Sequence, residues 1–197
     1  DTITRFDWRN RPIIVQNELA PHSAVEYDNL DRVVERGVFG SVPSTGDPIN
    51  SSNRLSHTIT SYGQRGRVFR SGVAIDPQNA TEGYLETHVW FDAVGRTVAE
   101  WAPSGPGMKR EFDALGRVTD EYTTDRGGDT APGSGSYADA TSLTSDIVLE
   151  QAAYRYNDDN RLDLVTSAVR IHDDSTTGGA LTTSTGVLTY VGYYYDD

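Results

Sequence analysis

One six-residue pattern recurs along the chain and limits the folds that it can adopt. The pattern is an aromatic residue, a turn residue (most often Asp), two variable residues, a small turn-forming residue and an Arg. The six complete copies contain Phe6, Asp7, Asn10 and Arg11; Tyr27, Asp28, Asp31 and Arg32; Tyr62, Gly66 and Arg67; Phe91, Asp92, Gly95 and Arg96; Phe112, Asp113, Gly116 and Arg117; and Tyr156, Asn160 and Arg161. A truncated seventh copy begins at Tyr195. This recurrence predicts a repeat protein made of one small unit.

The residue types in the pattern are those of a tight turn. The fifth position is always Gly, Asn or Asp, which best tolerate a left-handed backbone. The second position is mostly Asp or Asn, which can accept backbone N–H groups in an Asx-turn. Together they predict a type I turn followed by a left-handed residue and a bulge. We therefore expect each copy to be a hairpin tip, in which the aromatic ends the incoming strand and the Arg begins the outgoing strand.

The segments beside the pattern are typical of strands. Residues 67–70, 96–101 and 117–122 are short, partly alternating and rich in β-branched and aromatic residues. No long window keeps a helical period. The shortest spacing between motif aromatics is 21 residues, which fits a hairpin and its return. Longer spacings contain insertions of loop composition at 41–53, 76–83, 125–140 and 173–186. The sequence predicts an all-β chain whose residues 1–197 form a single run of antiparallel hairpins.

Two copies carry a resemblance to a known family. Residues 91–97 (Phe-Asp-Ala-Val-Gly-Arg-Thr) and 112–118 (Phe-Asp-Ala-Leu-Gly-Arg-Val) match the signature of the YD-repeat or RHS proteins, and the other four copies align with it. The resemblance implies a spiral of antiparallel β-hairpins that wraps into a hollow shell. Family members include toxin-encapsulating cocoons, insecticidal toxin components and cell-surface adhesion proteins. It therefore implies a secreted, extracellular or cell-surface location and a repeat that performs no chemistry itself.

The resemblance also implies that the repeats continue. Family shells contain more than six repeats, so we expect a segment of a longer polypeptide or filament, whose partners are further repeats or like copies packed head to tail. Toxin-releasing members also carry an aspartyl self-cleavage segment built around Asp-Pro-x-Gly. Here Asp47-Pro48 and Asp76-Pro77 lack the Gly, so no self-cleavage is assigned.

Composition excludes several functions. The net charge of −12 disfavours nucleic acid and anionic membranes, and no apolar run is long enough for membrane insertion. The absence of Cys excludes thiol catalysis and disulfides. Of 17 basic residues only Lys109 is a lysine. The paired acids at 158–159, 173–174 and 196–197 and the four scattered histidines predict neither a catalytic nor a zinc site. No cofactor is expected, although acidic turns at 125–129 and 157–160 leave calcium as an alternative.

These observations predict a non-enzymatic structural segment of an extracellular β-shell or filament. Two alternatives are a glycan- or cell-surface-binding adhesion module and part of a toxin-encapsulating cocoon, and a further rival is an enzyme with a site between loops. We expect the motif aromatics to be largely buried, in layers that follow one another along the repeats. We expect each motif Arg to bind a carboxylate or carbonyl of the neighbouring hairpin, with the Asp of its own motif as another partner in four copies.

Overall fold

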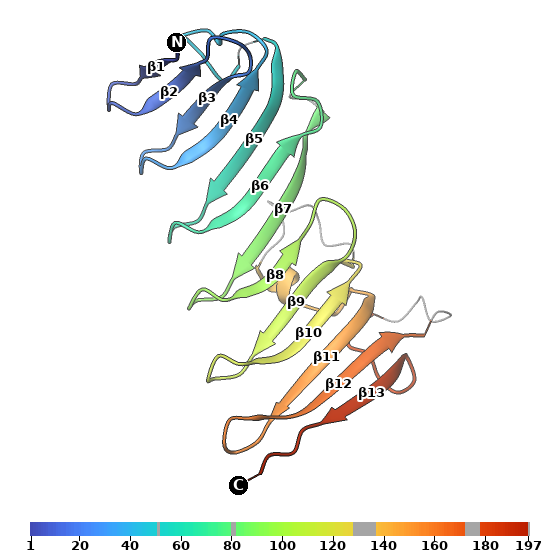
Figure 1. Ribbon diagram of the computed structural model, residues 1–197. Coiled ribbons are helices and arrows are strands. Elements are labelled where there is room, and N and C mark those ends of the chain that lie inside the picture. Colours follow the sequence, from blue (N-terminus) through green and yellow to red (C-terminus); the bar gives the residue numbers. More distant parts are fainter. Residues whose placement is uncertain (51, 80–81, 128–136, 172–177, 197) are drawn as a thin grey trace. The chain divides into compact units, whose positions relative to one another are not determined.

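The strands of the computed structural model form one antiparallel sheet in which each strand pairs with its neighbours in sequence (Figure 1). The structure describes residues 1–197 except 51, 80–81, 128–136, 172–177 and 197. The strands are β1 (Ile3–Phe6), β2 (Pro12–Gln16), β3 (His22–Tyr27), β4 (Val33–Phe39), β5 (Arg54–Tyr62), β6 (Val68–Ala74), β7 (Tyr84–Phe91), β8 (Thr97–Trp101), β9 (Gly107–Phe112), β10 (Val118–Thr124), β11 (Val148–Tyr156), β12 (Leu162–Arg170) and β13 (Gly186–Gly192). The predicted all-β hairpin fold is confirmed by this strand order.

The repeat pattern and the insertions occupy different connections of this sheet. All six complete motifs join an odd-numbered strand to the next strand through five residues. All four predicted insertions join an even-numbered strand to the next one, as at residues 40–53 between β4 and β5. The motif turns therefore lie at one end of the strands and the insertions at the other.

The chain divides into two compact units, Asp1–Thr87 and His88–Asp197, and β7 contributes residues to both. In the first unit the core consists of Ile14, Ala24 and Phe39 from the sheet and Ile49 from the insertion between β4 and β5. The insertion therefore covers the sheet face rather than extending from it as a loop, because its apolar side chain completes the core.

The second unit has two buried clusters, each completed by an insertion. The short helix α1 (Tyr137–Thr141) lies against β8 and β9 (Figure 1), and its Ala140 packs with Ala99 and Trp101. Leu181, between β12 and β13, packs in the other cluster, whose sheet residues include Tyr122. The predicted loop at 125–140 thus contains the start of a helix. No helix among the described residues is long and apolar enough to cross a membrane.

Candidate functional site

The fifth residue of every complete motif has a left-handed backbone. The φ angles are +62° at Asn10, +63° at Asp31, +75° at Gly66, +99° at Gly95, +86° at Gly116 and +63° at Asn160. This confirms the prediction that Gly, Asn and Asp occur there because other residue types would strain the turn.

The same two backbone hydrogen bonds close every motif turn. In the copy at Phe112, the N–H of Asp113 donates to the carbonyl of Arg117 at 3.0 Å, and the N–H of Gly116 donates to the carbonyl of Asp113 at 3.0 Å. Equivalent bonds form in all six copies, and the strand register shifts at or beside the motif in each. Each incoming strand ends at the motif aromatic, as predicted, but the outgoing strand begins one residue after the Arg. The Arg carbonyl is already used to close the turn.

The motif Asp holds both the turn and the Arg of its own motif. Oδ1 of Asp92 accepts the N–H groups of Val94, Gly95 and Arg96 at 2.7–3.0 Å, and Oδ2 accepts Nε of Arg96 at 2.6 Å. Partial burial alone raises the pKa of Asp92, but these hydrogen bonds from Arg96 and Gly95 outweigh burial and lower the pKa to about 2.

The same ion pair forms in the other copies that contain Asp. Nε of the motif Arg donates to Oδ2 at 2.6–2.7 Å in the pairs Arg11–Asp7, Arg32–Asp28 and Arg117–Asp113. The pKa of each of these three Asp side chains is lowered; in Asp28 the largest cause is the side-chain hydrogen bond from Arg32. The predicted partner within the motif is therefore present in all four copies.

Each of these guanidinium groups also lies over the aromatic ring of the next motif. We call this contact the inter-hairpin stack. The distance from the guanidinium carbon to the ring centroid is 4.6 Å for Arg11 on Tyr27, 4.5 Å for Arg32 on Tyr62, 4.4 Å for Arg96 on Phe112 and 4.2 Å for Arg117 on Tyr156. The sequence reasoning missed this contact, although an Arg and an aromatic at fixed places in every copy were its signal. The stack couples each of these hairpins to the next.

The remaining donors of the guanidinium extend the coupling to the next turn. Nη1 of Arg11 donates to the carbonyl of Asp28 at 3.1 Å and to Oδ1 of Asp31 at 2.7 Å. Nη1 of Arg117 donates to Oδ1 of Asn160 at 2.8 Å. The predicted bond from the motif Arg to a carboxylate or carbonyl of the neighbouring hairpin is therefore present for Arg11, Arg96 and Arg117. These bonds form together with the bonds inside the motif rather than instead of them.

The Tyr copies add one more bond between neighbouring hairpins. The hydroxyl of a motif Tyr donates to the carbonyl of the residue that follows the Arg of the preceding motif. The acceptors are Pro12 for Tyr27 (3.0 Å), Val33 for Tyr62 (3.1 Å), Val118 for Tyr156 (2.9 Å) and Leu162 for Tyr195 (2.7 Å). Phe112 keeps the ring contact without this bond. Tyr195 therefore occupies a motif position, as the truncated seventh copy predicts.

The prediction that the motif rings are largely buried holds for five of the six rings, which are only partly exposed, and is wrong for Phe6. In the copies at Tyr27, Tyr62, Phe112 and Tyr156 the guanidinium of the preceding motif covers one face of the ring, and solvent reaches part of the rest. Phe6 is 53% exposed, and no guanidinium of the described residues stacks on it. The rings are thus parts of contacts at the sheet edge and not layers of a core.

The copy at Tyr156 shows what happens without the acid. Oδ1 of Asn157 accepts the N–H groups of Asp159 and Arg161, so the turn keeps its shape. Arg161 lies over Tyr195 at 5.3 Å, farther than in the four copies with Asp. An Asp is therefore not needed for the turn, and where it is present it also binds the guanidinium of its own motif.

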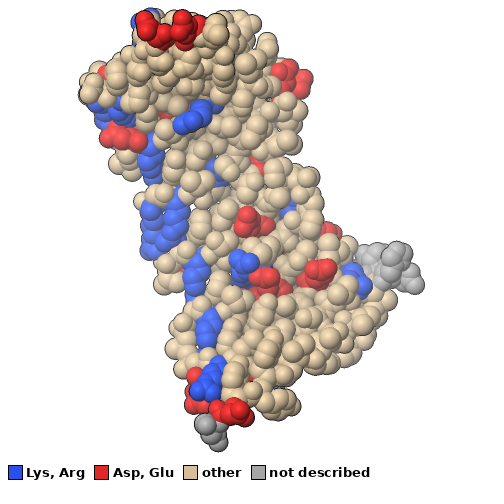
Figure 2. Space-filling model, viewed as in Figure 1, with Lys and Arg blue, Asp and Glu red and all other residues tan. Residues whose placement is uncertain are grey.

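Basic side chains follow the end of the sheet that carries the motif turns. Figure 2 shows them as a line of blue side chains along that edge, all of which are Arg because the single Lys109 is buried. Their positive charge is largely matched by motif acids, since the ion pairs of Arg11, Arg32, Arg96 and Arg117 are intact. This line is therefore a set of structural contacts and not an unpaired basic surface.

The acidic and histidine candidates do not assemble into a reactive site. Asp158 and Asp159 are exposed on the tip of the sixth motif, whereas residues 129, 172–174 and 197 lie outside the described residues. Within the described ranges, no three His, Asp or Glu side chains are grouped so that they could hold a metal ion. Buried His57 lies between Arg54 and Glu35, at 3.2 Å and 2.9 Å, as part of a buried polar network.

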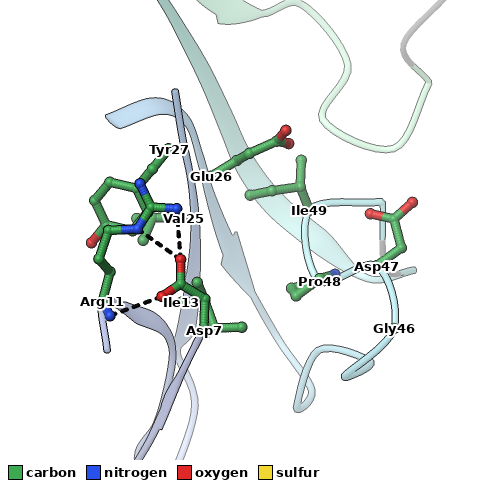
Figure 3. A pocket seen from close by; sticks show the side chains of 10 residues that line it. All are labelled: Asp7, Arg11, Ile13, Val25, Glu26, Tyr27, Gly46, Asp47, Pro48 and Ile49. Carbon is green, nitrogen blue, oxygen red and sulfur yellow. Dashed lines mark hydrogen bonds and ion pairs between the residues drawn. The ribbon is translucent and has the colours of Figure 1, made fainter. Parts of the chain in front are cut away.

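A cavity of about 280 Å³ lies beside the first motif turn (Figure 3). One wall comes from motif residues including Asp7 and Arg11, and the other from insertion residues 46–49. Glu26 also lines the cavity, and burial, followed by repulsion from Glu35 and Asp47, raises its pKa. The lining contains no Ser, Cys or His side chain; its carboxylates are Asp7, Glu26 and Asp47, and Asp7 is held by Arg11.

Comparison with known proteins finds similarity at the level of structure. No protein-family model matches the chain, and no curated protein matches it either. It matches a Photorhabdus luminescens Tc holotoxin pore at 11% identity, over 90% of this chain and 9% of that chain, with a TM-score of 0.39. It matches TcdB2-TccC3 without the hypervariable C-terminal region at 15% identity, over 99% and 12% of the two chains, with a TM-score of 0.32.

The resemblance predicted from the repeats is confirmed at this level, as a likeness to solved toxin structures. The likeness concerns the arrangement of strands alone, because the identities and TM-scores are low. This chain spans only 9–12% of the length of the two chains that it matches.

Proposed function

We propose that this chain is a non-enzymatic segment of a β-hairpin wall in a larger extracellular shell. The observation that carries the proposal is the inter-hairpin stack. Arg11, Arg32, Arg96 and Arg117 each bind their own turn and the next motif ring at once. The repeated side chains thus join each of these hairpins to the following one, as expected for a continuous wall of hairpins.

The same contacts support further repeats as the natural partners. A hairpin that lacks a neighbour leaves its stacking surfaces and strand edge open. We therefore infer that residues 1–197 act as one run of repeats and that like hairpins of the same polypeptide or of another copy continue it. The proposal includes secretion or display at the cell surface, because the proteins that the repeats resemble work there.

The experiment uses the complete polypeptide that contains these residues. We expect electron microscopy of the purified polypeptide to show a hollow particle with these strands in its wall. Limited proteolysis should leave any enclosed segment intact until the wall is opened. A solid globular particle, or an enclosed segment cleaved as fast as an isolated peptide, would contradict the shell.

Adhesion is the second candidate, and exposed apolar tips favour it. In the first unit Trp8 and Leu30 lie in motif turns and are 85% and 69% exposed. Exposed aromatic side chains on a rigid turn are suited to contact a glycan or protein surface. A glycan array probed with this chain and with Trp8→Ala tests this candidate. Glycan binding that the substitution abolishes would favour adhesion. If the unmodified chain binds no glycan, the wall function remains as the one candidate.

A further inference from the structure

The single lysine of the chain is buried among apolar side chains. Lys109 lies on β9 and is 2% exposed. Its neighbours across the sheet on the same side are Ala99 on β8 and Tyr122 on β10, and both are buried. The other 16 basic residues are Arg, so the chain places a primary amine side chain only at this position.

The amine of Lys109 faces the buried carboxylate of Asp146. Its Nζ lies 2.7 Å from Oδ2 of Asp146, and the side chain of Asp146 is 1% exposed. Nζ also donates a hydrogen bond to the carbonyl of Ser142 at 2.6 Å. Oδ2 of Asp146 accepts no hydrogen bond of good geometry from the described residues, so the two groups are close without being aligned as donor and acceptor.

The backbone holds Asp146 in this place. Its N–H donates to the carbonyl of Leu143 at 3.1 Å, and its carbonyl accepts the N–H of Gly179 at 2.9 Å. The next residue, Ile147, is tied to Asp125 by two bonds of 2.8 and 3.0 Å. The carboxylate is therefore presented to the amine by a fixed segment, which is the condition for a high effective concentration of two reacting groups.

We propose that Lys109 and Asp146 become joined by an intramolecular amide bond. A proton passes from the ammonium of Lys109 to the carboxylate of Asp146, and the neutral amine attacks Cγ. A second proton passes from Nζ to a carboxyl oxygen, the C–O bond breaks and one water molecule leaves. The ammonium and carboxylate together contain all the atoms of the amide and the water, so no co-reactant is needed.

The surroundings favour the joined form. Two charges held away from water carry a large desolvation penalty, and a neutral amide in their place removes both charges. The carbonyl of Ser142 accepts the N–H that remains on the amide. An Arg at this position would keep its charge and could not act as the nucleophile. The bond would fasten the segment around Asp146 to the sheet in a chain that has no Cys for disulfides.

Mass spectrometry of the folded and then denatured chain tests the proposal. We expect the intact mass to be lower than the sequence mass by one water molecule. Digestion after Arg should yield residues 97–110 and 127–155 as one joined peptide, which separates this bond from water loss elsewhere. The full sequence mass after prolonged incubation of the folded chain would overturn the proposal. The unmodified chain gives this answer, so the test does not depend on whether a variant folds.

Two substitutions sharpen the result. Lys109→Arg keeps the positive charge without the amine and should show the full sequence mass. In Asp146→Asn no carboxylate accepts the ammonium proton, so the protons must pass to the amide nitrogen, and any joined product should show loss of one ammonia molecule in place of water. A water loss that persists in Lys109→Arg would place the bond elsewhere and refute the assignment.

Discussion

The connections at the two ends of the strands follow different rules. Connections that carry the motif are all five residues long and close with the same two hydrogen bonds. The connections at the other end vary in length, from the short segment 102–106 to the long segment 125–147. The residues that they bury against the sheet also differ between the two units. One end therefore repeats a contact between hairpins, whereas the other varies and covers the sheet.

This difference shows how a repeat protein can vary in sequence and loop length while it keeps the contacts between its repeats. A motif turn must present its Arg to the next ring, so its backbone and side chains are restricted. A covering insertion must only bury an apolar side chain on the sheet, and Ile49, Ala140 and Leu181 do this from unlike segments. Length and sequence can change there as long as one such side chain remains.

The largest expected effect concerns a covering insertion. Ile49→Ala removes a side chain that is 3% exposed, so we expect a loss of about 2–4 kcal/mol in the free energy of unfolding. Val42→Ala in the same insertion is the control, because Val42 is 44% exposed and its loss should cost at most about 0.5 kcal/mol. Urea unfolding of both variants measures the difference, and equal losses would show that the insertion is not part of the core.

A motif turn should be the next most sensitive. Gly116 has a φ of +86°, so Gly116→Val forces a β-branched side chain into the left-handed region and should cost about 1–3 kcal/mol. Gly46→Val is the matched control, since Gly46 has no such φ and a Cβ there meets no atom within 4 Å. If the two variants unfold at the same urea concentration, the turn does not depend on its left-handed residue.

Removal of one motif Arg should have a smaller effect. Arg117→Met loses the ion pair with Asp113 and the stack on Tyr156, and we expect a cost of about 1–2 kcal/mol. Arg117→Lys should recover only part of this, because an ammonium cannot pair and stack as a planar guanidinium does. The control is Arg155→Met, whose ion pair with Asp163 is exposed at the surface. Full recovery by Lys would mean that charge alone matters.

The lowered pKa values of the motif Asp side chains predict that the folded chain loses stability at low pH. The folded pKa of Asp92 is about 2, below the unfolded value of roughly 4. Its contribution is therefore complete above the unfolded pKa and is lost as the pH falls toward 2. Asp92→Asn keeps an oxygen for the turn, as Asn157 does, and should reduce the slope of stability against pH in this window. An unchanged slope in the variant would contradict the assigned pKa.

Local features of the sequence were enough to predict the turns. A left-handed fifth position depends on one residue type, so Gly95 and Asn160 could be assigned without their surroundings. The stack on Tyr156 could not be predicted, because Arg117 lies far away in sequence and meets the ring only through the pairing of successive hairpins. Ile49 was also missed, since a single buried side chain leaves no periodic signal in an insertion.

A double-mutant cycle between Arg117 and Tyr156 tests the central claim, that motif side chains join each hairpin to the next. The cycle compares the unfolding free energies of the unmodified chain, Arg117→Met, Tyr156→Leu and the double variant. We predict a favourable coupling of about 0.5–2 kcal/mol, because the guanidinium lies 4.2 Å from the ring centroid and is held there by Asp113. Additive losses, with no coupling between the two positions, would contradict the account.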